Sequence, residues 1–203
     1  MRHAHKRFHL GVFGPGGSGK TEYAMKFVAN APATCVYFFD EELEFSERMN
    51  IQPARTHWEL DQALHTGWVA FDPHTMFQGR MEEALEYFAK LTMATAPKLP
   101  GRKFFVMDEG GLKMDGHNVG PEVKRLIQSG GRVGGIDGVW IGQGPNELHN
   151  NVRQQLTEVV SFQMMEECAL DWLKKFGFNS DELRTLGPYR YVCRNKRGGE
   201  VRG

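Results

Sequence analysis

The feature that most constrains the fold is the segment GPGGSGKT at residues 14–21. It follows Gly11-Val12-Phe13, which predicts the end of a buried strand, and it precedes a run with helical spacing. Glycines let the backbone wrap an anion with its N–H groups pointing inward, and a helix start adds further N–H groups and partial positive charge. The full G-x-x-x-x-G-K-[ST] pattern between a strand and a helix therefore indicates a site for nucleotide phosphates.

The polar residues of this segment have expected partners. Lys20 can reach the β- and γ-phosphates of ATP, and the Thr21 hydroxyl can bind Mg²⁺. We expect Lys20 to have no structural partner of its own. The alternative, a glycine-rich turn with a chance lysine, does not account for the complete pattern. The expected ATP-binding loop consists of Gly14, Pro15, Gly16, Gly17, Ser18, Gly19, Lys20 and Thr21.

The rest of the chain has the pattern of one α/β domain over residues 1–203. Apolar strand-like runs alternate with helical ones, which predicts a mostly parallel sheet flanked by helices. Strands are expected at RFHLGVFG, TCVYFF, GWVAFD, KFFVMD, GVWIGQ, EVVSFQ and YRYVCR, with a polar connection after the second. Helices are expected from Lys20 to about Ala29 and near 79–95, 120–129, 146–156 and 168–176.

Composition narrows the possible partners. Lys and Arg together number 25, as do Asp and Glu, so any contact with nucleic acid must be local. The basic ends, RHAHKR and RYVCRNKRGGEVRG, are solvated by default and could supply such a contact. The three isolated cysteines suit a reducing compartment, and no apolar run approaches the roughly 20 residues of a membrane span. We expect a soluble intracellular protein.

A second motif, KFFVMDEGG, ends an apolar strand in two acids. Asp108, at the carboxyl end of that strand, can hold the Mg²⁺ shell beside the phosphate loop. Glu109 can polarise a water for attack on the γ-phosphate, which favours hydrolysis over transfer to a small-molecule hydroxyl. The alternative is an acidic pair that merely opens a turn before Gly110 and Gly111.

Two further polar residues surround the strand GVWIGQ. Gln143 at its tip can sense the γ-phosphate or orient the lytic water through its amide, or it can simply cap a turn. Arg132, at the end of the preceding helix, could reach a nucleotide held by a neighbouring subunit, or it could be an ordinary surface residue. The rival arginines are Arg80, Arg125 and Arg153, of which Arg153 is the strongest.

Other polar groups favour simpler interpretations. His3, His5 and His9 alternate, but they have no nearby acid or cysteine, so a solvated start is favoured over metal binding. The acids at 40–42 end a strand at the edge where the phosphate loop also lies, so they can either support that site or form a solvated loop.

The chain resembles the FtsK–HerA superfamily of DNA-pumping ATPases over roughly residues 8–195. The resemblance lies in the order of four segments: GPGGSGKT, FFVMDE, GRVGGI and, after a further strand, GQGP. Within that superfamily the chain is similar to the genome-packaging ATPases of icosahedral viruses with an internal membrane. The resemblance implies a RecA-like (ASCE) P-loop fold. It also implies that Asp108 supports the metal, Glu109 is the catalytic base, Gln143 is the sensor and Arg132 is an arginine finger acting in trans.

The resemblance further implies ATP-driven translocation of double-stranded DNA into a preformed capsid. The expected partners are DNA, further copies of the chain in a hexameric or pentameric ring, and capsid or vertex proteins. The expected location is the host cytoplasm or the packaging vertex of the virion. Two alternatives remain from the residues: a nucleoside or nucleotide kinase, and a nucleotide-switch protein of phage assembly or secretion.

Overall fold

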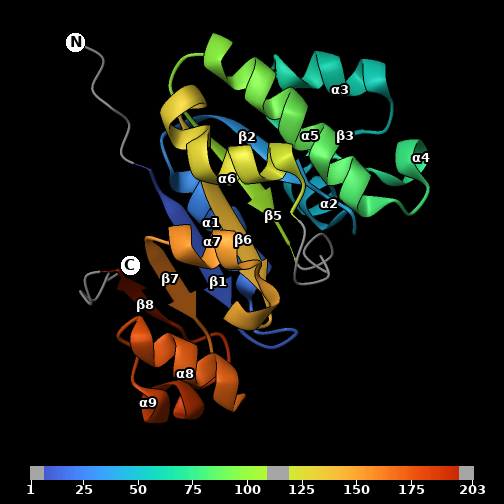
Figure 1. Ribbon diagram of the computed structural model, residues 1–203. Helices are drawn as coiled ribbons and strands as arrows, with labels where there is room; N and C mark the ends of the chain where they lie inside the picture. Colours follow the sequence, from blue (N-terminus) through green and yellow to red (C-terminus); the bar gives the residue numbers. More distant parts are fainter. Residues whose placement is uncertain (1–6, 109–118, 197–203) are drawn as a thin grey trace.

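The computed structural model describes residues 7–108 and 119–196, which build one eight-stranded sheet with helices on both faces (Figure 1). The strand order is β3-β4-β2-β5-β6-β1-β7-β8. Neighbouring strands run parallel except β7 and β8, which are antiparallel. The expected mostly parallel α/β sheet is therefore confirmed.

The bounds of the elements follow the expected alternation of strands and helices. The strands are β1 His9–Phe13, β2 Ala33–Phe39, β3 Pro53–Ala54, β4 Trp68–Phe71, β5 Arg102–Met107, β6 Ile136–Gly142, β7 Glu158–Ser161 and β8 Val192–Asn195. The α-helices are α1 Lys20–Asn30, α2 Glu44–Met49, α3 His57–Leu64, α4 His74–Phe77, α5 Met81–Thr95, α6 Pro121–Gly134, α7 Asn150–Gln155, α8 Glu167–Lys175 and α9 Ser180–Thr185. Short 3-10 helices span η1 Ala96–Lys98 and η3 Pro145–Glu147.

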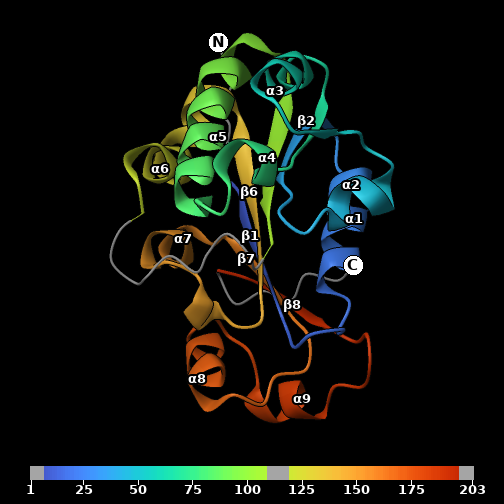
Figure 2. The same ribbon diagram turned by 90° about the vertical axis from the view of Figure 1, so that its right-hand side faces the viewer.

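Side-chain alternation along the central strands produces two apolar cores, one on each face of the sheet. On β5, Phe105 and Met107 join the core under α3, α5, α6 and α8, while Phe104 and Val106 join the core under α1. Figure 2 shows this sheet nearly edge-on, with α5, α6 and α7 on one side and α1 and α2 on the other. Burial on both faces explains why these strands are continuously apolar in sequence.

The polar connection expected after the second strand is wrong, because residues 40–67 contain α2, β3 and α3. These elements are short, and local contacts fix their ends. Asp40 accepts the N–H groups of Phe45 and Ser46 at the start of α2, at 3.0 and 2.7 Å. Thr56 and Glu59 form a reciprocal capping box at the start of α3.

Helix α6 also extends further than expected, to Gly134 instead of residue 129. Its start is fixed from another helix, because the Glu86 carboxylate on α5 accepts the N–H groups of Glu122 and Val123, both at 2.9 Å. The glycines near its end stay helical where they pack closely: a Cβ added at Gly134 would lie 3.1 Å from that of Ala96. The helix stops at Gly135, which has the left-handed φ of 66°.

Buried charged groups tie elements together at the amino ends of the strands. Asp137 is fully buried, accepts the Phe8 N–H at 3.0 Å and forms an ion pair with Arg102. Lys103 is 3% exposed and its Nζ donates to the carbonyls of Leu99 and Gly134, at 2.6 and 3.0 Å. These contacts fix where β1 and β6 begin.

Within the ranges described above, no helix is long and apolar enough to cross a bilayer.

His9 on β1 is buried against Trp140, whose Nε1 donates to His9 Nδ1 at 3.1 Å. Burial is the main cause that lowers the pKa of His9 from 6.5 to about 4, and the charge of Arg7 lowers it further. The residue is thus a neutral core group, as its contact with Trp140 also requires. Within residues 7–108 and 119–196, no group of three or more His, Cys, Asp or Glu side chains is arranged to hold a metal ion.

We expect His9 to make folding sensitive to acid. Its pKa is lower in the folded than in the unfolded chain, so its contribution is complete above pH 6.5 and is lost as the pH falls toward 4. On lowering the pH from 7 to 4, wild type should lose about 3 kcal/mol more unfolding free energy than His9→Gln. Urea unfolding of both proteins at several pH values measures this, since the carboxylates titrate alike in both. Equal losses would show that His9 does not carry the effect.

Candidate nucleotide site

The candidate site lies at one edge of the sheet, where the parallel strands β1, β6 and β5 end side by side. The phosphate loop follows β1, Gln143 follows β6, and Asp108 follows β5. Because β6 pairs with both neighbours, its tip emerges between the loop and Asp108. A ligand in open parallel sheets binds at this edge, so the topology places the three segments where the sequence motifs predict.

The loop has the conformation that its glycines predict. Gly17 and Gly19 have positive φ values of 72° and 101°, and Gly19 caps α1. Within the described chain, the N–H groups of Gly16, Gly17, Gly19 and Thr21 donate no hydrogen bond. A loop with donors left open at a helix start is suited to an anion with several oxygens, such as a polyphosphate.

Lys20 differs from expectation in one respect. Its side chain is only 6% exposed, and its Nζ donates to the Pro15 carbonyl across the loop at 3.0 Å. The lysine therefore has a structural partner without a nucleotide, and the prediction that it has none is wrong. The contact holds the ammonium over the loop, in the position from which it can bind phosphate oxygens.

The two expected metal ligands lie together. Thr21 Oγ1 donates to Asp108 Oδ2 at 2.9 Å, which joins the start of α1 to the end of β5. A hydroxyl and a carboxylate side by side provide the hard oxygen ligands that Mg²⁺ prefers when water fills the remaining positions. The residues present therefore fit the metal that the sequence predicts.

A cavity of about 680 Å³ opens over these residues and shows which other side chains face the loop. Gln143 lies on its wall and is exposed, and its backbone N–H donates to Glu147 Oε2 at 2.7 Å. The acids at 40–42 also line the cavity, so they do not form a loop remote from the site. Of these, Asp40 is engaged in capping α2.

The sequence analysis missed several residues on this wall, among them Glu22, Glu44, Arg48 and Tyr189. Arg48 forms ion pairs with Glu22 on α1 and with Glu44 on its own helix, so it links α2 to the helix that carries the loop. The spacing of Glu44 and Arg48, four residues apart, was a readable helical signal. Tyr189 comes from the far end of the chain, and no local pattern connects it with the loop.

The structure does not place all the predicted catalytic residues. Glu109 lies outside the described residues. Arg132 is exposed in the last turn of α6, shortly before β6 begins. Because β6 runs parallel to β1, Arg132 lies at the edge of the sheet opposite the loop of its own subunit. Among the described arginines, only the side chains of Arg132 and Arg190 make no hydrogen bond or ion pair with a described residue.

The rival arginines have partners within their own subunit. Arg80 forms an ion pair with Glu83 at 2.8 Å, and Arg125 does so with Glu122 at 3.5 Å. Arg153 contacts Asn146 and Asn150, which lie close in sequence. Arg132 is therefore the least constrained of the arginines that the sequence put forward.

Comparisons with known proteins bear on the fold alone. No family model matches the sequence, and no curated protein does. Among solved structures, the genome packaging NTPase B204 from Sulfolobus turreted icosahedral virus 2, in complex with AMPPCP, has a TM-score of 0.74 at 18% identity over 97% of this chain and 96% of that one. The DNA-packaging ATPase B204 from Sulfolobus turreted icosahedral virus gives 0.64 at 17% identity, over 96% and 95% of the two chains.

A more distant neighbour extends the same likeness. The pCW3 conjugation coupling protein TcpA, in a monomer form with ATPγS, has a TM-score of 0.55 at 15% identity, over 94% of this chain and 58% of that one. Identities this low establish shared architecture. The expected similarity to viral genome-packaging ATPases is therefore confirmed for the fold, which is the expected RecA-like P-loop fold.

Proposed function

We propose that the protein is an ATPase that translocates double-stranded DNA and packages a viral genome into a preformed capsid. The observation that carries this proposal is the assembly of the open N–H donors, Lys20, the Thr21–Asp108 pair and Gln143 around one cavity. Packaging NTPases of the same fold, crystallised with nucleotide analogues, support the choice of reaction.

The residues of the site have separate roles in the proposed hydrolysis. The loop and Lys20 neutralise phosphate oxygens, and Thr21 and Asp108 would hold Mg²⁺, which supplies positive charge to the β- and γ-phosphates. Glu109 follows Asp108 directly, so we assign it the proton of the attacking water. Gln143, between the loop and Asp108, is assigned to orient that water or to report the γ-phosphate.

We propose that the protein acts as a homo-oligomeric ring. Arg132 lies at the edge away from its own loop, so only the loop of a neighbour is available to it. The chain is neutral overall, so DNA is expected to contact a few local cations in the ring through its phosphates, with little sequence preference. Capsid or vertex proteins, and a location in the host cytoplasm or at the virion vertex, belong to the same proposal.

The test of this function is ATP turnover by the purified protein with and without double-stranded DNA. We expect hydrolysis that DNA stimulates and that falls steeply as salt is raised, because phosphate contacts release counterions. Glu109→Gln should lower turnover by roughly two to four orders of magnitude, the usual contribution of a general base, and still bind ATP. DNA-independent transfer of phosphate to a nucleoside would contradict the proposal in favour of a kinase.

We also expect Arg132 to act across a subunit boundary. An arginine finger is typically worth about 10³–10⁵ in turnover, so Arg132→Ala should lose hydrolysis and still bind ATP. Mixing Arg132→Ala with Lys20→Ala should restore part of the activity, because some interfaces then pair an intact loop with an intact finger. Arg125→Ala, on the same helix, is the matched control and should stay active. With subunit exchange verified, a mixture without activity would contradict the trans role.

A further inference from the structure

A second cavity, of about 730 Å³, adjoins the one over the phosphate loop. The two share Gly19, Glu22 and Tyr189 on their walls. The second cavity runs along the outer side of α1 and is lined on its other side by the aromatic rings of Phe162, Tyr189 and Tyr191. Its size is that of pockets that bury small organic ligands, and its walls are largely apolar.

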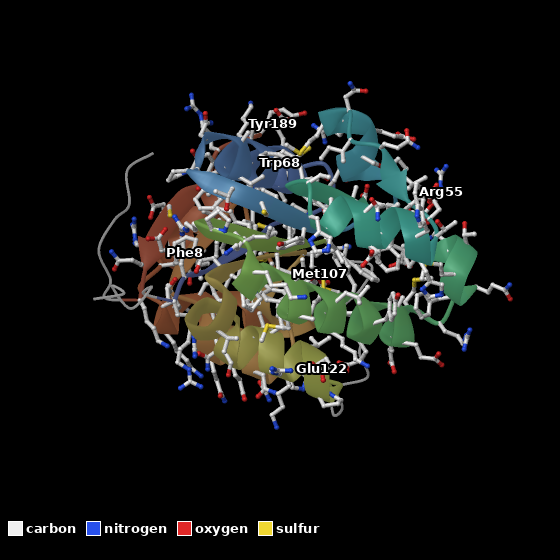
Figure 3. The ribbon with its side chains drawn as sticks, turned by 90° about the horizontal axis from the view of Figure 1, so that it is seen from above. Phe8, Arg55, Trp68, Met107, Glu122 and Tyr189 are labelled. Carbon is white, nitrogen blue, oxygen red and sulfur yellow. The ribbon has the colours of Figure 1, made fainter. Side chains whose placement is uncertain are left out.

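The aromatic residues around this cavity differ in exposure: Phe162 and Tyr191 pack against other rings, whereas Tyr189 is largely uncovered. Phe162 is 3% exposed and contacts Tyr191 at a centroid distance of 5.6 Å, and Tyr191 packs edge-to-face on Tyr23 at 4.8 Å. Tyr189, in contrast, is 72% exposed. Figure 3 shows Tyr189 on the α1 side of the sheet, opposite the side where Glu122 of α6 lies. An aromatic ring with an uncovered face beside a cavity can stack on a flat ligand.

The backbone of Tyr189 supports a role beyond packing. Its φ is +59°, in the left-handed region that a residue with a bulky side chain rarely adopts. A turn holds it there, since the N–H of Arg190 donates to the carbonyl of Gly187 at 3.1 Å. Unfavourable backbone conformations of this kind cluster at ligand sites, where the surrounding structure maintains them.

Gly19 connects the two cavities. A Cβ added there would lie 3.3 Å from Tyr189 Cδ1 and 3.6 Å from Phe162 Cε1, so these two rings lie directly beside the start of α1. Gly19 also belongs to the phosphate loop. A molecule that places its phosphates on the loop can extend past Gly19 into the second cavity. A planar group attached to those phosphates would then reach the aromatic rings.

We propose that Tyr189, with Phe162 and Tyr191, forms the nucleobase pocket of the site, and that the base of the nucleotide stacks on Tyr189. This inference rests on the proposed phosphate role of residues 14–21. Lys26 and Glu22, paired at 3.0 Å, lie on the α1 wall and supply the polar groups that meet the edge of the base. Stacking accepts every base, so discrimination among nucleotides depends on these edge contacts.

The experiment compares two probes, ATP and inorganic tripolyphosphate, by calorimetric titration in the presence of Mg²⁺. Loss of the stacking contact between a base and an aromatic ring lowers the binding affinity about tenfold or more. Tyr189→Ala should therefore weaken ATP binding about tenfold and leave tripolyphosphate binding unchanged. Tyr189→Phe keeps the ring and should bind ATP within about twofold of wild type. Trp58→Ala removes another side chain that is 72% exposed, lines neither cavity, and is the matched control.

The two proposals fail in different ways. If wild type binds neither probe, the phosphate role of the loop is wrong. If wild type binds tripolyphosphate and Tyr189→Ala binds ATP as wild type does, the nucleobase pocket is wrong and the phosphate site stands. Equal weakening of both probes by Tyr189→Ala would also overturn the pocket, because the residue would then act through the shape of the loop.

Discussion

The pairing of β6 between β1 and β5 is the constraint on which the rest of the site depends. Parallel pairing puts three carboxyl ends at one edge, so segments about 90 and 120 residues from the loop in sequence reach it without any long excursion. The hydrogen bond between Thr21 and Asp108 then fixes the helix that carries the loop against the strand that carries the acid. A shift of register in either strand pair would separate the metal ligands.

The two edges of the sheet are built for different tasks. At the amino ends, buried charges such as Asp137 and Lys103 have their partners and hold strand starts in place. At the carboxyl ends, the loop keeps N–H groups open among described residues, and two adjoining cavities surround it. Polar groups with protein partners stabilise the fold, whereas the open N–H groups of the loop are available to a ligand that carries acceptor oxygens. This division supports a nucleotide site at the carboxyl edge.

Much of the fold and of the phosphate loop was predictable because short stretches of the sequence encode it. Continuous apolar strands predict a sheet covered on both faces, and the loop motif carries its own geometry in Gly17 and Gly19. Two of the parts that sequence missed depend on contacts between distant segments. The end of α6 depends on packing against Ala96, and the place of Tyr189 depends on how the last strand returns beside α1. The partner of Lys20 was missed because it is a loop carbonyl, which has no sequence signature.

The proposed function requires that the loop at residues 14–21 holds the phosphates of ATP. Calorimetric titration of ATP with Mg²⁺ into wild type and Lys20→Ala tests it most directly, with Lys175→Ala, an exposed lysine at the end of α8, as the control. We expect Lys20→Ala to bind at least about 100-fold more weakly, because it loses charge-assisted hydrogen bonds to phosphate, while circular dichroism shows the fold retained. Equal affinity in wild type and Lys20→Ala would contradict the claim.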